Sequence, residues 1–135
     1  MQIRRFQKGD EAAVIALWRQ CGLVVPQNDP ARDIALKHAW QPELFFVGEL
    51  HGRIVASVMA GYEGHRGWIN YLAVEPDEQR QGRGRQLMEA AENALRALGC
   101  PKINLQVRAA NAGVRAFYER IGYSLDNVIS LGKRL

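Results

Sequence analysis

One stretch near the middle of the chain, residues 72–88, restricts the possible folds more than any other. It contains an apolar run, a Pro-Asp turn, a glycine motif and then a helical pattern: Leu72-Ala73-Val74, Pro76-Asp77, Gln79-x-x-Gly82-x-Gly84, and Arg83 onward. Glycines let a backbone approach a ligand closely and adopt torsions that other residues resist. The first N–H groups of the following helix lack partners within the helix and lie at the positive end of its dipole. The order strand, glycine turn, helix therefore predicts an anion site.

Three arginines, Arg80, Arg83 and Arg85, add positive charge around this turn, and we interpret it as a cradle for a pyrophosphate group. An ordinary strand–turn–helix corner is the alternative, because short glycine motifs have many false positives. Two other nucleotide motifs fit badly. A P-loop requires Lys and then Ser or Thr after its last glycine, where this chain has Arg85-Gln86. A Rossmann fingerprint has a third Gly or Ala where this chain has Leu87.

The length of 135 residues indicates one domain, residues 1–135, with a sizeable core. No apolar run reaches the length of a membrane helix, and the N-terminus lacks the apolar region of a signal peptide. Two cysteines, Cys21 and Cys100, form no framework, and no Cys/His cluster has metal spacing. We therefore expect a cytoplasmic protein with no membrane partner and no metal. The net charge of +4 suits an anionic ligand but is too small and dispersed to indicate a nucleic acid.

Hydrophobic periodicity predicts the order of the elements. Strands are expected at 2–6, 44–50, 53–61, 68–74 and 103–107, with one or two more within 123–131. Helices are expected from Asp10 to Gly22, after Asn28 or Asp29, from about 83 to 98, and from 111 to 121. The strand–helix–strand unit in the second half implies a parallel pair, whereas His51-Gly52 has the form of a tight hairpin turn. We expect an α/β (α+β) fold with a mixed, mostly antiparallel sheet of 6–7 strands and about four helices on both faces.

Some side chains allow two interpretations. Trp18 lies at helical spacing with apolar residues and is expected in the core, and His38 is expected on the surface. The loop 62–67 places Glu63 and His65 between glycines. It is either a solvated hairpin tip or a loop that contacts substrate, because loops on rigid scaffolds often carry function.

The glycine motif and the last helix together resemble the GCN5-related N-acetyltransferases (GNAT). The resemblance rests on Gln79-x-x-Gly82-x-Gly84 before a helix, and on Asn111 and Tyr118 within Asn-Ala-Gly-Val-Arg-Ala-Phe-Tyr-Glu-Arg-Ile-Gly-Tyr. Arg80-Gln81-Gly82 and 107–112 are similar to bacterial ribosomal-protein N-terminal acetyltransferases. The segments 28–30, 61–67, 99–103 and 130–135 resemble the small bacterial acetyltransferases of the YpeA type.

The resemblance implies acetyl-CoA as the acetyl donor and an amine of a small molecule, peptide or protein as the acceptor. It implies that the backbone of Leu72, Ala73 and Val74 pairs with the pantetheine arm. It also implies that the amides of Gln79, Arg80, Gln81, Gly82, Arg83, Gly84 and Arg85 hold the pyrophosphate. Asn111 is expected to contact the CoA arm, and Tyr118 to protonate the leaving thiolate. A phenol of pKa about 10 beside a thiol of about 8.5 can donate that proton at modest cost, although Tyr118 could instead be a core residue.

One position departs from the ribosomal-protein enzymes, in which a glutamate on the strand after the glycine-motif helix acts as base. Gln106 stands there and cannot usefully accept a proton. Glu63, His65 or Glu49, acting through water, are the candidate replacements. The departure leaves open a non-catalytic acyl-CoA-binding sensor on the same fold, against which the presence of Tyr118 argues. A third class, a small basic nucleic-acid binder, would need an arginine-rich face with stacking aromatics, whereas the arginines concentrate at the glycine turn. A homodimer through an exposed edge or final strand is also possible from the sequence.

Overall fold

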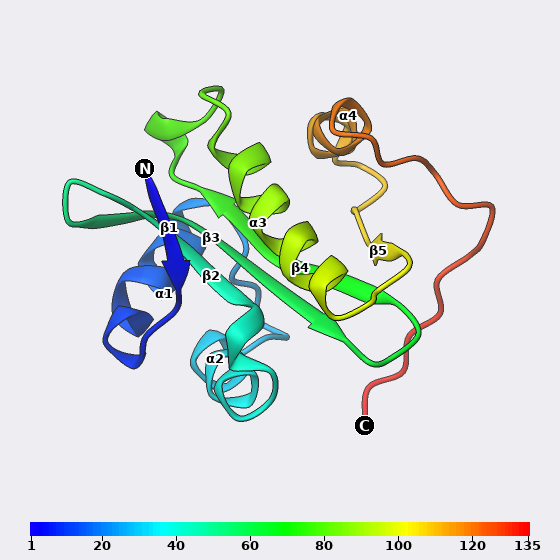
Figure 1. Ribbon diagram of the computed structural model, residues 1–135, viewed down its shortest axis with the longest axis horizontal. Coiled ribbons are helices and arrows are strands. Elements are labelled where there is room, and N and C mark those ends of the chain that lie inside the picture. Colours follow the sequence, from blue (N-terminus) through cyan, green and yellow to red (C-terminus); the bar gives the residue numbers. More distant parts are fainter. The chain divides into compact units, whose positions relative to one another are not determined.

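Five strands form one sheet, in the order in which they occur along the chain (Figure 1). The computed structural model describes residues 1–135 as two units, 1–105 and 106–135, and the whole sheet belongs to the first. The first four strands pair antiparallel, and only the last pair is parallel. The strands are β1 (Gln2–Arg5), β2 (Phe45–Leu50), β3 (Arg53–Tyr62), β4 (Gly67–Val74) and β5 (Ile103–Leu105). The predicted mixed, mostly antiparallel sheet is therefore confirmed.

The predicted number of strands, six or seven, is wrong, because residues 123–131 form no strand. This segment contains the β-branched pair Val128-Ile129 and other apolar residues, which favour a strand locally. A strand also needs a neighbouring backbone for its hydrogen bonds and a core for its apolar face. Here the side chains of Leu125, Val128, Ile129 and Leu131 are 78%, 74%, 85% and 88% exposed. Local β propensity cannot supply the neighbouring strand or the core surface that a strand needs.

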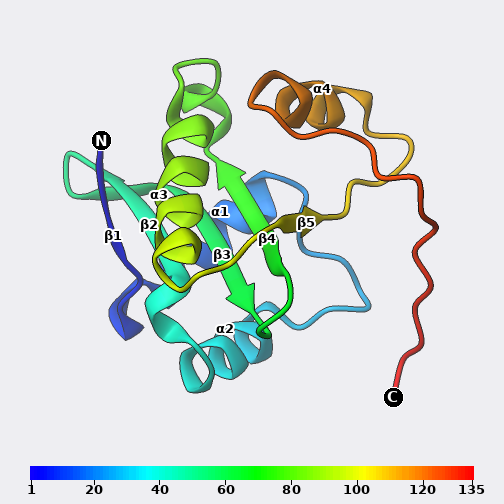
Figure 2. The ribbon, with the colours of Figure 1, turned by 45° about the vertical axis from the view of Figure 1, so that its right-hand side comes forward.

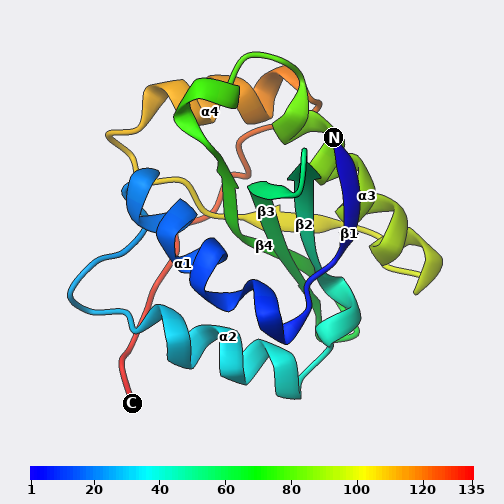
Figure 3. The same ribbon diagram turned by 90° about the vertical axis from the view of Figure 1, so that its left-hand side faces the viewer.

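Helices cover both faces of the sheet, as predicted. Figures 2 and 3 show α1 (Glu11–Gln20) and α2 (Pro30–Ala39) on one face and α3 (Arg83–Ala97) on the other. Three single-turn 3₁₀ helices, Lys8–Asp10, Pro42–Leu44 and Pro76–Glu78, lie in the connections. The second unit contains α4 (Ala112–Arg120). The expected total of about four helices is confirmed.

Aromatic residues form much of the core between the sheet and the first two helices. The rings of Phe6 and Phe45 are stacked with centroids 4.4 Å apart, and both residues are buried. Trp18 is fully buried on α1, which confirms its predicted place in the core. His38 is exposed on α2, which confirms its predicted place on the surface. Burying large apolar rings of this kind is the main favourable contribution to folding.

The local signals at the start of α2 and at the first hairpin were interpreted correctly. Asp29 is the N-cap of α2, and its side chain accepts a hydrogen bond of 3.2 Å from the Arg32 N–H, with Pro30 in the first turn. His51 and Gly52 have φ values of 52° and 75°. Two consecutive positive values are what a tight type I′ hairpin turn between β2 and β3 requires.

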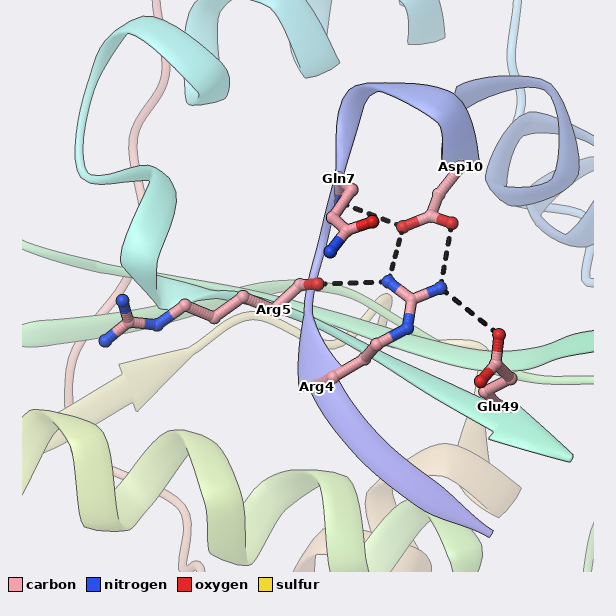
Figure 4. Close-up of polar contacts among 5 residues, drawn as sticks. All are labelled: Arg4, Arg5, Gln7, Asp10 and Glu49. Carbon is pink, nitrogen blue, oxygen red and sulfur yellow. Dashed lines mark hydrogen bonds and ion pairs between the residues drawn. The ribbon is translucent and has the colours of Figure 1, made fainter. Parts of the chain in front are cut away.

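Asp10 occupies the N-cap position of α1, where the helix was expected to begin, but its side chain makes no capping hydrogen bond. It has φ −84° and ψ −8°, whereas a capping residue normally has an extended backbone. Its carboxylate instead accepts hydrogen bonds from the two terminal nitrogens of Arg4, at 2.8 and 2.9 Å, and from the Gln7 N–H at 2.8 Å (Figure 4). The hydrogen bonds from the Arg4 guanidinium hold the pKa of the Asp10 carboxyl below its usual value, although partial burial of the carboxyl acts in the opposite direction. Arg4 also reaches Glu49 of β2, at 3.4 Å.

Candidate functional site

The second half of β4 has one edge that no strand occupies. β5 pairs with β4 only at Gly67, Trp68 and Ile69, and no pairing on that side reaches residues 70–74. We call residues 70–74 the open edge. Unpaired strand backbone presents alternating N–H and C=O groups, which an extended chain of amides can pair with as an added strand. Leu72, Ala73 and Val74, the predicted pantetheine-binding residues, all lie on this edge.

A β-bulge interrupts β4 in the middle of the open edge. Ser57 pairs with Ala73 and Met59 with Asn70, so that Tyr71 and Leu72 together lie opposite the single residue between them on β3. Tyr71 has φ 52°, which is unusual for a bulky residue. Bulges of this kind take backbone groups out of the ladder and turn them in a new direction. The register pairs Leu72 with no residue of either neighbouring strand.

Residues of two helices, α1 and α2, hold the Tyr71 side chain in place. Its ring is stacked on that of Trp18 with centroids 3.8 Å apart, and its hydroxyl donates a hydrogen bond of 2.6 Å to a carboxylate oxygen of Asp33 on α2. Burial, then the hydrogen bond and charge of Asp33, raise the pKa of the Tyr71 phenol, which therefore stays protonated. Neither Tyr71 nor Asp33 was singled out from the sequence, since a positive φ on a tyrosine leaves no local signal there.

The loop from the open edge to α3 contains two left-handed residues. After the turn at Pro76–Glu78, Arg80 has φ 63° and Gly82 has φ 77°, and α3 begins at Arg83. The first helical hydrogen bond of this end joins the Gln86 N–H to the Gly82 carbonyl. The N–H groups of Arg83, Gly84 and Arg85 thus precede the first helical donor. A Cβ on Gly82 would meet no atom within 4 Å, so the space beside this backbone is open to a ligand.

The arginines of the loop differ in their partners. Arg83 forms an ion pair of 2.7 Å with Glu78, and Arg85 forms an exposed pair of 3.2 Å with Glu89. Arg80 is exposed and pairs with no carboxylate. Gln79 donates from its side-chain amide to the Val74 carbonyl, at 2.9 Å, which links the loop to the end of β4. Arg80 is therefore the one unpaired cation of the loop. Most of the groups that could bind an anion here are backbone N–H groups.

In the second unit, Asn111 and Tyr118 lie on one short helix. Asn111 is the N-cap of α4, and its side chain accepts a hydrogen bond of 3.2 Å from the Val114 N–H. Tyr118 is buried, and the rings of Phe117 and Tyr123 meet it edge-on at 5.1 and 5.6 Å. Burial raises the pKa of the Tyr118 phenol to about 12. The phenol is therefore protonated throughout the neutral range, which is the state that a proton donor needs.

The candidate bases are engaged in local contacts. One carboxylate oxygen of Glu63 accepts hydrogen bonds from the backbone N–H groups of His65 and Arg66, which orders the hairpin between β3 and β4. This hairpin precedes Leu72 by five residues of β4, or roughly 16 Å at the rise of a strand. Glu49 is paired with Arg4. Gln106 donates from its side-chain amide to the Ser130 hydroxyl.

Comparison with known proteins identifies the class. The model of the Acetyltransferase (GNAT) family matches residues 11–123. The chain belongs to the acetyltransferase (GNAT) family. An acetyltransferase from Yersinia pestis (strain Pestoides F) is 48% identical over 135 residues, which are 100% of this chain and 96% of that protein. The family resemblance predicted from the glycine motif and the last helix is confirmed, and acetyl transfer is the chemistry of this GNAT protein.

Two solved structures show the same fold. The ribosomal-protein-S18-alanine N-acetyltransferase from Escherichia coli is 25% identical, with a TM-score of 0.76 over 90% of this chain and 76% of that one. The PaiA N-acetyltransferase from Thermoplasma acidophilum, solved in complex with coenzyme A, is 15% identical, with a TM-score of 0.80 over 95% of this chain and 92% of that one. No helix of the GNAT chain is long and apolar enough to cross a membrane, and no three potential metal ligands gather in one place.

Proposed function

We propose that this GNAT protein transfers the acetyl group of acetyl-CoA to an amine by direct attack, with both substrates bound together. The observation that carries this proposal is the succession, between Asn70 and Arg85, of an open strand edge, a bulge and a loop that leads to the unpaired N–H groups at the start of α3. Each part fits a different portion of one extended ligand. The edge suits the amides of pantetheine, the bulge suits the thioester, and the loop suits the pyrophosphate.

The loop residues would hold the donor mainly through their backbone. The amides of Gln79, Arg80, Gln81, Gly82, Arg83, Gly84 and Arg85 are assigned to the pyrophosphate. Gly82 supports this assignment because its left-handed backbone lies beside open space. The guanidinium of Arg80 supplies an unpaired positive charge at the same turn. Asn111 is assigned to the CoA arm by the family resemblance, in addition to its role as a helix cap.

The transfer forms a bond between the amine nitrogen and the carbonyl carbon and breaks the bond between that carbon and sulfur. Negative charge develops first on the carbonyl oxygen, where the N–H of Leu72 or Ala73 would stabilise it. It then moves to the departing sulfur, to which Tyr118 would donate the phenolic proton. The proton lost by the amine passes to a base, for which Glu63, His65 and Glu49, acting through water, remain predictions. A lysine-type amine needs such a base more than an α-amine does, because its pKa is higher.

The acceptor is proposed only by class, as an amine of a small molecule, peptide or protein. GNAT proteins act on amines, and the similar Escherichia coli enzyme is named for an alanine of a ribosomal protein. Gln106, where ribosomal-protein enzymes have a glutamate, argues against transferring that acceptor to this chain. It also favours the second candidate, a non-catalytic acyl-CoA sensor, because the amide is hydrogen-bonded to Ser130 and cannot serve as a base.

The test is calorimetric titration of the purified protein with acetyl-CoA, followed by measurement of free thiol in the presence of a panel of amines. The proposal expects acetyl-CoA to bind and thiol to appear only when a suitable amine is added. Binding without release on any amine of the panel would favour the sensor. Absence of binding would overturn the assignment of residues 70–85.

A further inference from the structure

Ser57 is the one polar residue that is fully buried in the core of the sheet, and it lies beneath the bulge. It is on β3, where it pairs with Ala73 across the two strands. Its hydroxyl donates a hydrogen bond of 3.0 Å to the Tyr71 carbonyl and accepts one of 2.9 Å from the indole N–H of Trp18. Both hydrogen-bonding roles of the hydroxyl are therefore used, and the Trp18 ring is itself stacked on Tyr71.

The hydrogen bond to the Tyr71 carbonyl determines where the next N–H points. The chain has no cis peptide bond, so the planar unit between Tyr71 and Leu72 is trans. In a trans peptide, the C=O and the N–H point in opposite directions. Since Ser57 draws the Tyr71 carbonyl toward the core, the Leu72 N–H must point away from Ser57. Leu72 also has no register partner on β3 or β5.

We propose that Ser57 is a positioning residue for acetyl transfer, which orients the Leu72 N–H toward the carbonyl oxygen of the bound thioester. This inference rests on the proposed function, in which a backbone N–H of Leu72 or Ala73 polarises that oxygen, and it selects Leu72. Donors fixed before the reaction stabilise developing charge best, because they need no reorganisation as it forms.

The positive φ of Tyr71 explains why such a support is needed. A bulky residue adopts this conformation only when its surroundings enforce it. Trp18 stacks on the Tyr71 ring and Asp33 accepts from its hydroxyl, whereas Ser57 donates to the peptide carbonyl itself. Without the Ser57 hydroxyl, the side chain of Tyr71 keeps its contacts while the peptide unit that follows is free to turn. The position of the residue and the direction of the N–H are thus controlled separately.

The decisive experiment compares Ser57→Ala with the wild-type protein by isotope-edited infrared spectroscopy of acetyl-CoA labelled with ¹³C at the carbonyl carbon. In wild-type protein, the carbonyl stretch of bound acetyl-CoA should lie at lower wavenumber than in free acetyl-CoA. In Ser57→Ala, most of this shift should be lost, and kcat should fall roughly 10- to 100-fold, less than the full loss of an oxyanion donor. Affinity for CoA, which has no thioester carbonyl, should change by less than about threefold, since its other contacts remain.

Trp18→Phe is the matched control, because it removes the other hydrogen bond of Ser57 and leaves the one to Tyr71. It should lower stability but keep the infrared shift. Ser57→Thr, which restores a hydroxyl, should recover the shift. An unchanged shift in Ser57→Ala, or an equal loss in Trp18→Phe, would overturn the inference. If Ser57→Ala does not fold by circular dichroism, Ser57→Cys, with a weaker donor, must show an intermediate shift, and a full wild-type shift there would overturn it.

The failure of the proposed function would look different. Wild-type protein that binds no acetyl-CoA would refute the donor assignment itself. Wild-type protein that binds acetyl-CoA without any carbonyl shift would leave the donor site intact and overturn the role of both Leu72 and Ser57.

Discussion

Replacement of Gly82 by alanine should weaken acetyl-CoA binding far more than it weakens the fold. Gly82 is the residue before α3 and has φ 77°, in the left-handed region. An L-residue with a Cβ is disfavoured there by about 1–2 kcal/mol. No atom lies within 4 Å of the Cβ that alanine would add, so this backbone cost should be the whole loss of stability. For a chain of 135 residues, the change corresponds to a fall in Tm of about 3 to 7 °C.

The effect on binding has a separate origin. The added methyl group would occupy the open space beside the Gly82 backbone, where the pyrophosphate is proposed to approach. Displacing the anion so that one charge-assisted hydrogen bond to an amide is lost costs about 1.5–3 kcal/mol. That loss corresponds to an affinity lower by roughly 10- to 150-fold. Gly82→Trp, with a larger side chain in the same space, should abolish measurable binding.

Gly99→Ala is the control for backbone strain. Gly99 follows the other end of α3, has φ 83°, and would also place a Cβ in open space. The helix between them spans 15 residues, or about 22 Å, so the control is remote from the proposed anion. Both variants should lose similar stability by thermal unfolding, and only Gly82→Ala should lose affinity by calorimetry. Equal affinities, within threefold of wild type, would refute the assignment of this loop to the pyrophosphate.

Three further changes test Tyr118, the loop arginines and the ion pair between Arg4 and Asp10. Tyr118→Phe should lower kcat by about a hundredfold or more, measured by thiol release, with acetyl-CoA affinity unchanged. Burial raises the pKa of Tyr118 to about 12, so at any pH below about 11 wild-type activity should not fall through deprotonation of this phenol. An unaltered kcat would leave Tyr118 a core residue. Arg80→Ala should weaken acetyl-CoA binding about fivefold at low salt and less at high salt. Arg85→Ala, which removes an arginine already paired with Glu89, should change the affinity less than twofold. Equal effects of the two substitutions would contradict the distinction between the unpaired Arg80 and the paired Arg85. Asp10→Asn should lower the free energy of unfolding by about 1 kcal/mol at neutral pH, measured with urea. Since Arg4 lowers the pKa of Asp10 in the folded state, this stabilisation is complete above the unfolded pKa of about 3.9 and is lost as the pH falls through the folded value, so the two proteins should converge in strong acid. A constant difference at every pH would show that the ion pair is not its source.

Signals carried by neighbouring residues predicted most of the elements. The Asp29-Pro30 pair marks the start of α2, and His51-Gly52 marks the first hairpin, because capping and tight turns depend on side chains and φ values within a few residues. The parallel pair β4–β5 followed from the strand–helix–strand order alone. The strand prediction for residues 123–131 was wrong because strand formation depends on more than neighbouring residues. Their β propensity is local, but a strand requires a partner that local sequence does not specify.

The sequence by itself determined the loop that is proposed to bind the pyrophosphate. A glycine that tolerates φ 77° must be encoded where the loop turns, and the helix that follows supplies the unpaired amides. Only the tertiary structure decided how the neighbouring bulge is held. Ser57 and Tyr71 are 14 residues apart, and Trp18 and Ser57 are 39 apart, so neither contact leaves a pattern in any short window. The direction of one backbone N–H beside the proposed thioester depends on these contacts, because a peptide unit in a bulge is fixed by whatever its carbonyl meets in the core.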